Sequence, residues 1–320
     1  MLVTFQNETI QIDAAIMLGE KMERKSLAWF LGITFLISWP LFLVPLLFQE
    51  MDPTNKQLMT KGLWAVAMWG PGIAAIFTTV FIAKQPFKNL RLNTLGPKRY
   101  YLWAWLLPIG LTLIAGSITL VFGIAKLDLN FSMIRNAMAS AANGNSISAE
   151  KAVAIQVLFA VTLAPFINML FALGEELGWR GYLLPHLMPL GQWKAILISG
   201  IIWGVWHAPA IAQGHNYPGY PILGIFMMVI LCVLLGTILS WLYLNTRSPW
   251  VAALAHGSFN AVAGLPVLFL LPGFDMALGG TLASASAWIG MVVFIVWLVM
   301  TKRLPVAEQV NNEKVELQPE

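Results

Sequence analysis

Charged residues are scarce in this sequence, and cysteine is almost absent. Only 11% of the 320 residues are Asp, Glu, Lys or Arg, whereas 58% are hydrophobic and the mean hydropathy is +0.73. A soluble fold cannot hide so much apolar side chain from water, so this composition predicts a membrane protein. The single cysteine, Cys232, excludes an intramolecular disulfide and a cysteine metal cluster, and we interpret it as a small apolar filler.

Eight long apolar runs indicate the fold class. They lie near Ser26–Phe48, Gly62–Ala83, Tyr101–Ala125, Ala152–Leu173, Ala195–Ala212, Ile222–Leu244, Val251–Leu271 and Ala285–Thr301. None alternates as a barrel strand would, and a helix satisfies its own backbone groups in lipid. We therefore predict an all-α polytopic transmembrane bundle of about eight helices.

The runs also define the predicted organisation of the chain. We expect a cytoplasmic N-terminal segment at 1–25, a membrane domain at 26–301 whose functional core covers 152–271, and a disordered cytoplasmic tail at 302–320. The first 25 residues lack the pattern of a secretory signal, so the first run is expected to direct insertion. Ser148, followed by Lys151, is expected to cap the start of the fourth run.

The distribution of Lys and Arg predicts the orientation. With the N-terminus inside, fourteen of these residues fall in cytoplasmic segments and five on the other side. The positive-inside rule then places both termini in the cytoplasm, and we expect a multi-pass protein of the cell (inner or plasma) membrane. This distribution also explains the pI near 9.2, so the basic charge gives no reason to expect a nucleic acid partner.

Ionisable side chains inside the membrane cost roughly 2.5–3.5 kcal/mol or more, and here they gather in only three of the eight runs. The first group closes the fourth run and contains Glu175, Glu176 and Arg180. Glu176 and Arg180 are four residues apart, so they can pair on one helix face, while Glu175 points about 100° away. An unmatched carboxylate in a dry site is suited to taking a proton from water.

The other two groups are Trp203 with His207, and His256 with Asn260. His256 and Asn260 are also four apart, so both project from one helix face. Alone, each group has an ordinary explanation, either as a charge cluster at a helix end or as a polar contact between helices. Together they indicate one shared polar site inside the bundle.

In this order the three groups resemble the motifs of the CPBP (Abi) family of intramembrane peptidases, which includes the type II CAAX prenyl endopeptidases. The family pattern is Glu-Glu-x-x-x-Arg, then aromatic-x-x-x-His, then His-x-x-x-Asn or Asp, and it is matched at 175–180, 203–207 and 256–260. Trp203 stands where Phe is usual. The resemblance covers Phe166–Val262 and implies an eight-helix bundle whose site opens toward the cytoplasm.

The resemblance also implies a role for each residue. Glu175, assisted by His207, would activate water, His256 and Asn260 would hold the oxyanion, and Arg180 would brace Glu176. The predicted catalytic residues are Glu175, Glu176, His207, His256 and Asn260. Glu175, His207 and His256 could also hold a zinc ion, but no His-Glu-x-x-His pair is present, and the resemblance favours a metal-free, glutamate-driven mechanism.

The expected substrate is a membrane-associated protein or peptide, such as a C-terminally lipidated chain or a bacteriocin-like peptide. The alternative is a non-catalytic membrane protein that acts in bacteriocin immunity or as a scaffold. A transporter with a Glu/His proton relay is disfavoured because the sequence shows no inverted repeats.

The predicted helix limits create a problem of depth. A fourth helix from Ala152 would put Glu175 at its cytoplasmic end, whereas His207 lies a dozen residues into the fifth run, roughly 18 Å deeper. The two can meet only if the fourth helix begins later or continues through residues 182–184, or if the fifth begins later.

Overall fold

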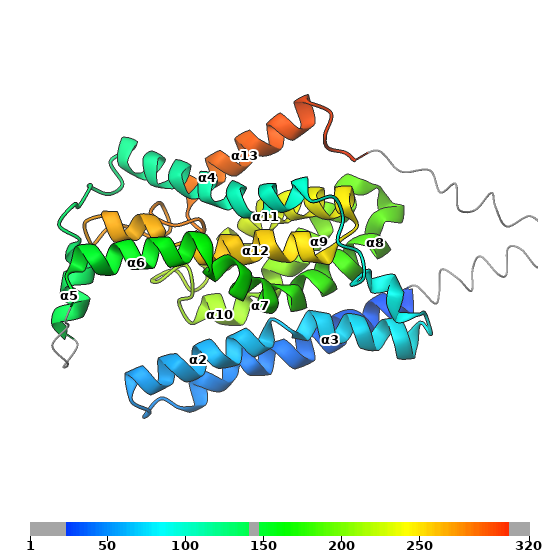
Figure 1. Ribbon diagram of the computed structural model, residues 1–320. Helices are drawn as coiled ribbons and strands as arrows, with labels where there is room; N and C mark the ends of the chain where they lie inside the picture. Colours follow the sequence, from blue (N-terminus) through cyan, green and yellow to red (C-terminus); the bar gives the residue numbers. More distant parts are fainter. Residues whose placement is uncertain (1–23, 141–146, 307–320) are drawn as a thin grey trace, which may run out of the picture.

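The computed structural model describes residues 24–140 and 147–306 and shows a bundle of helices (Figure 1). Within these residues the only β-type pairing is an isolated bridge between Leu127 and Leu270, so the predicted all-α class is confirmed. The segment 1–23 and most of the predicted tail lie outside the described residues.

The helices follow one another in a simple order. The first segment, Arg24–Leu47, ends in the 3-10 turn η1 (Val44–Leu47). The others are α2 (Pro53–Ala67), α3 (Gly70–Phe77), η2 (Thr78–Ile82), η3 (Phe87–Leu90), α4 (Arg99–Val121), α5 (Ser132–Ser140), α6 (Ala149–Thr162), α7 (Ala164–Gly178), η4 (Trp179–Leu183), α8 (Leu184–Leu187), η5 (Met188–Leu190), α9 (Gln192–Trp206), α10 (Ala208–Ala212), α11 (Leu223–Thr246), α12 (Pro249–Val262), η6 (Leu265–Phe269) and α13 (Ala285–Met300).

All eight apolar runs are helical, but they differ in length. Five helical segments of the described chain are long and apolar enough to cross a membrane, and a pair bent by 50°, Ala149–Thr162 with Ala164–Leu190, makes a sixth. The fifth run is divided at His207 into α9 and α10, of 15 and 5 residues, and the eighth gives α13, of 16 residues. At 1.5 Å per residue, α9 and α13 are each shorter than a hydrocarbon core of about 30 Å. The chain is thus a multi-pass membrane protein, and two of its eight predicted spans are corrected to short helices.

The bend in the fourth run resolves the problem of depth. Ser148 caps α6 as predicted, by accepting from the backbone N–H of Lys151, but Pro165 then sits in the first turn of a new helix. Pro165 has no N–H to donate to the carbonyl of Val161, four residues earlier, and its ring crowds that carbonyl, which accounts for the break between α6 and α7 at Leu163. The helical path from Ala164 then runs through η4 and α8 as far as Leu190, as one of the sequence-based alternatives required.

A hairpin then brings the chain back along itself. Gly191, whose φ of 93° suits glycine, starts the return into α9. Glu175 precedes Gly191 by 16 residues and His207 follows it by 16, so both lie at the same depth.

Helix α7 occupies the centre of the bundle. It packs against α12 on one side and α3 on the other, while α9 packs against α11 (Figure 1). Two glycines permit these close contacts: a Cβ on Gly174 would lie 2.7 Å from the carbonyl oxygen of Met68, and one on Gly257 would lie 2.5 Å from the backbone nitrogen of Met169. The backbones next to Glu175 and His256 can therefore approach closely.

The turn before α5 is organised by a carboxylate. Asp128 accepts from the backbone N–H groups of Ser132 at 2.7 Å and Asn130 at 2.9 Å. These hydrogen bonds, that of Ser132 first, hold the pKa of Asp128 below its ordinary value despite the desolvation that opposes them.

Candidate active site

The side chain of Glu175 is held by two indole groups. Trp203, on α9, donates from Nε1 to Glu175 Oε2 at 2.6 Å, and Trp179, one turn along from Glu175, donates to the same oxygen at 3.3 Å. The glutamate is only 2% exposed. No described residue hydrogen-bonds to Oε1, so one carboxylate oxygen is fixed and the other is left for a water or substrate group.

Glu176 joins two helices through a single oxygen. Its Oε1 accepts from Arg180 Nη1 at 3.0 Å, as the four-residue spacing predicted, and from His256 Nδ1 on α12 at 2.8 Å. The Arg180 guanidinium also lies 4.3 Å from the ring centroid of Trp203. Glu176 and Arg180 are fully buried, so each depends on its partner for compensation of its charge.

The hydrogen bonds of both histidines fix their tautomers. His207 Nδ1 lies 2.9 Å from the carbonyl oxygen of Trp203, and because a carbonyl only accepts, this nitrogen must carry the proton. His256 Nδ1 faces a carboxylate oxygen and must donate as well. In each ring Nε2 is left for chemistry, as an acceptor when the ring is neutral and as a donor when it is protonated.

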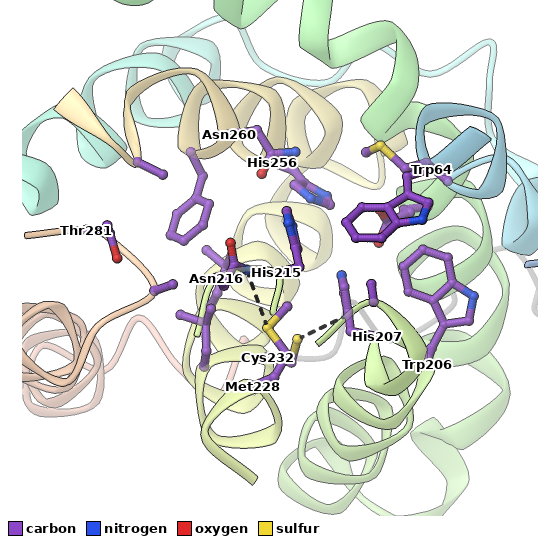
Figure 2. A pocket seen from close by; sticks show the side chains of 18 of the residues that line it. Trp64, Trp206, His207, His215, Asn216, Met228, Cys232, His256, Asn260 and Thr281 are labelled. Carbon is purple, nitrogen blue, oxygen red and sulfur yellow. Dashed lines mark hydrogen bonds between the residues drawn. The ribbon is translucent and has the colours of Figure 1, made fainter. Parts of the chain in front are cut away.

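A cavity of about 630 Å³ collects these groups. Glu175, His207, His256 and Asn260 all line it, and Figure 2 shows the last three pointing into the same space. Glu176 does not line this cavity. The structure therefore brings four of the five predicted catalytic residues to one chamber and puts the fifth behind His256.

Three further residues reach the cavity that the sequence did not point to. Cys232, from α11, places its Sγ 3.8 Å from His207 Nδ1, while His215 and Asn216 enter from the loop before α11 (Figure 2). His215 also meets the Trp64 ring edge to face, with centroids 5.0 Å apart. Neither spacing nor hydrophobic pattern links these positions to the motifs, because only the packing of α11 and of the loop before it brings them there.

The direction of the cavity bears on the predicted orientation. Its lining includes residues of the loop between α10 and α11 and of the segment after α12, which lie at the end of the bundle opposite the one where the described chain begins and ends (Figure 1). If both termini are cytoplasmic, the cavity extends away from the cytoplasm. The cytoplasmic opening implied by the resemblance and the orientation predicted from Lys and Arg thus exclude each other in this structure.

A zinc site was the alternative chemistry for the same residues. Both histidines donate Nδ1–H to an oxygen, as zinc-bound histidines commonly do. However, nowhere in the part of the chain that the structure describes do three His, Cys, Asp or Glu side chains lie close enough together to hold an ion. The set Glu175, His207 and His256 therefore does not fit a three-ligand centre as arranged.

Comparison with known proteins agrees with the motifs. Residues 151–262 match the family described as "Type II CAAX prenyl endopeptidase Rce1-like", and this segment contains all three motifs. A "CAAX prenyl protease 2" from Methanococcus maripaludis is 33% identical over 98 residues, which are 28% of this chain and 35% of that relative. The chain thus matches about a third of the length of this curated relative. By its motifs and over the matched residues 151–262, the chain is similar to the type II CAAX prenyl endopeptidases of the CPBP family.

Proposed function

We propose that this protein is an intramembrane endopeptidase that hydrolyses a peptide bond with water activated by Glu175. One observation carries the proposal: Glu175, His207 and His256, from three separate helices, line one cavity, and a buried partner orients each of them. Membrane helices seldom contain ionisable side chains, and those that do commonly mark a functional site.

The base is Glu175. Its Oε2 is bound by the two indoles, so Oε1 is the oxygen that would take the proton from water. His207 lines the same cavity with Nε2 as an acceptor and would orient the attacking water or receive its proton. Because Glu175 and His256 are only 2% and 4% exposed, a water between them would act in a site of low dielectric constant.

The oxyanion would be held from α12. The buried site contains two glutamates and one arginine, so a protonated His256 would bring its formal charge to zero. The imidazolium would then donate from Nε2, and Asn260 could donate its amide N–H from the same helix face. Glu176 and Arg180 are positioning residues in this mechanism, because they hold the His256 ring through Nδ1.

The cavity indicates the class of substrate. Its volume lies within the range of about 300–1,000 Å³ common for ligand sites, and Phe42, Trp206, Leu231, Leu235 and Phe259 contribute to its wall. We propose that it accepts an apolar stretch of a membrane-associated protein or peptide. A C-terminally lipidated protein, suggested by the name of the archaeal relative, and a bacteriocin-like peptide are the two candidates.

The test compares the membrane and secreted peptides of cells that carry the intact protein or the Glu175→Gln or His256→Ala variant. A C-terminal fragment that disappears in both variants, at unchanged membrane levels of the protein, supports the proposal. Glu150→Gln is the matched control, because Glu150 is an exposed carboxylate that pairs with Arg135 outside the cavity. If the biological effect and the peptide pattern survive both site variants, the protein acts without catalysis, as an immunity factor or scaffold.

A further inference from the structure

A second cavity lies apart from the active site. It has a volume of about 720 Å³ and shares no lining residue with the first. Its walls come from the segment 79–94 after α3, from η4 and α8, and from the end of α11. These elements gather at the end of the bundle where the described chain begins and ends (Figure 1).

The charge of this cavity is entirely positive. Lys88, Arg91 and Arg247 line it, and no aspartate or glutamate does. None of the three forms an ion pair with any carboxylate among the described residues. Gln85, Asn89 and other neutral hydrogen-bonding side chains complete the polar wall. Such a lining complements a multivalent anion, and arginine in particular matches the geometry of phosphate oxygens.

The backbone at the two arginines is a second, independent observation. Arg91 ends η3 with a φ of 56°, and Arg247 ends α11 with a φ of 53°. Glycine or asparagine usually takes this left-handed position, because a Cβ is unfavourable there. A cation at a helix C-terminus is stabilised by the helix dipole, but that gain is generally smaller than the conformational cost. Two arginines thus occupy strained backbone positions at the wall of one cavity.

Aromatic rings complete the lining of this cavity. Tyr243 lines it together with both arginines. In the same cavity His186 stacks on Tyr182, with ring centroids 4.1 Å apart, and its Nδ1 lies 2.7 Å from the carbonyl oxygen of that tyrosine. Nδ1–H therefore donates to that oxygen, and Nε2 remains for another partner.

The surroundings place this cavity beside lipid. Phe81 and Phe87, on the segment that forms one wall, are 64% and 47% exposed, as side chains that contact lipid would be. Basic pockets between membrane helices near a cytoplasmic surface are known to bind anionic headgroups. The predicted orientation puts this end of the bundle in the cytoplasm.

We propose that this cavity binds a phosphate-bearing anion through Arg91, Arg247 and Lys88. The shared chemistry is a phosphate group, carried either by an anionic membrane lipid or by a free phosphate compound. The proposal does not depend on peptidase activity.

The test is the thermal unfolding of the purified full chain in neutral detergent at constant ionic strength. The added probes are short-chain phosphatidylglycerol, short-chain phosphatidylcholine, inorganic phosphate and chloride. We expect phosphatidylglycerol to raise Tm more than phosphatidylcholine does. If inorganic phosphate also raises Tm above the chloride reference, the phosphate group alone suffices. If phosphatidylglycerol raises Tm and inorganic phosphate does not, the ligand is the lipid headgroup. If only inorganic phosphate raises Tm, the ligand is a free phosphate compound.

The variants separate binding from folding. In the Arg91→Gly and Arg247→Gly double variant, the relief of backbone strain should keep or raise Tm without a probe, while affinity should fall roughly tenfold or more for each lost arginine. Arg91→Gln with Arg247→Gln retains side chains if the glycine variant fails to fold. Lys194→Gln with Lys302→Gln is the matched control, because both lysines lie outside the cavity and Lys302 also has a φ of 55°.

Three results would overturn the proposal. The first is a wild-type Tm that no phosphate probe raises above chloride. The second is a shift that phosphatidylcholine reproduces in full, which would be a general lipid effect. The third is a shift that persists in the arginine variants, or is lost equally in the lysine control, which would place the anion elsewhere.

Discussion

Replacement of Trp203 by Phe tests how the catalytic carboxylate is held. The family pattern usually has Phe at this position, so the fold should accept the change. Phe keeps an aromatic ring beneath the Arg180 guanidinium but removes the N–H that lies 2.6 Å from Glu175 Oε2. A hydrogen bond to a charged group contributes about 1.5–3 kcal/mol, which corresponds to roughly 10- to 150-fold in rate if it is felt in full in the transition state.

Two other tryptophans make this experiment a graded series. Trp179 donates to the same oxygen at the longer distance of 3.3 Å, while the Trp206 N–H has no acceptor among the described residues. All three side chains are buried, at 0%, 2% and 1% exposure for Trp179, Trp203 and Trp206. Each Trp→Phe change therefore removes the same atoms from a similar environment, so differences between the variants report the hydrogen bond.

We expect the Trp203→Phe variant to lose the most activity, the Trp179→Phe variant less and the Trp206→Phe variant the least. Stability would be measured by thermal unfolding in detergent, and activity as the initial rate at which the Glu175-dependent peptide product forms per amount of protein. Equal losses in the three variants, or the largest loss at Trp206, would show that the indole bonds do not hold Glu175 and that our account of the site is wrong.

Three other perturbations follow from the contacts. Arg180→Met leaves Glu176 with one partner in a buried site, so the free energy of unfolding should fall by about 3–5 kcal/mol; a Tm within error of wild type would refute this. Gly174→Ala should push α7 away from α3 and lower the free energy of unfolding by about 1–3 kcal/mol. Gly110→Ala is the control, because a Cβ there meets no atom within 4 Å, and it should leave stability unchanged or raise it. Equal effects of the two changes on thermal unfolding would contradict the described packing. The pKa of Asp128 is lowered in the folded protein, so this carboxylate stabilises the fold at pH values above its unfolded-state pKa of about 4, and the stabilisation is lost as the pH falls through its folded-state pKa. Asp128→Asn should therefore flatten the acid side of a curve of Tm against pH. Parallel curves for the variant and the wild type would contradict this.

The amino-acid sequence was sufficient where a single helix decides the outcome. Continuous apolar runs predicted the all-α class, because a backbone in lipid must satisfy its own hydrogen bonds. The four-residue spacing of Glu176 and Arg180 predicted their ion pair, and that of His256 and Asn260 predicted that both side chains face one space. These relations depend only on the helical repeat.

Helix limits were less predictable because hydrophobicity alone does not mark them. The fourth run was expected to be one span, yet Pro165 divides it and the helical path continues to Leu190. This extension gives Glu175 and His207 equal distances from Gly191 and so brings them to one depth. The fifth run is likewise divided, at His207, into α9 and α10, whereas the eighth run agrees with α13 to within one residue.

Contacts between helices were decided by the tertiary structure alone. The hydrogen bond from His256 to Glu176 and the one from Trp203 to Glu175 both join separate helices, so only the tertiary packing could show them. The second bond gives Trp203 a role that the Phe usual at this position could not fill. The entry of His215 and Cys232 into the cavity and the position of Arg91 and Arg247 at the second cavity have the same origin. A sequence pattern records the spacing along one helix, but the distance between two helices depends on how all their side chains pack.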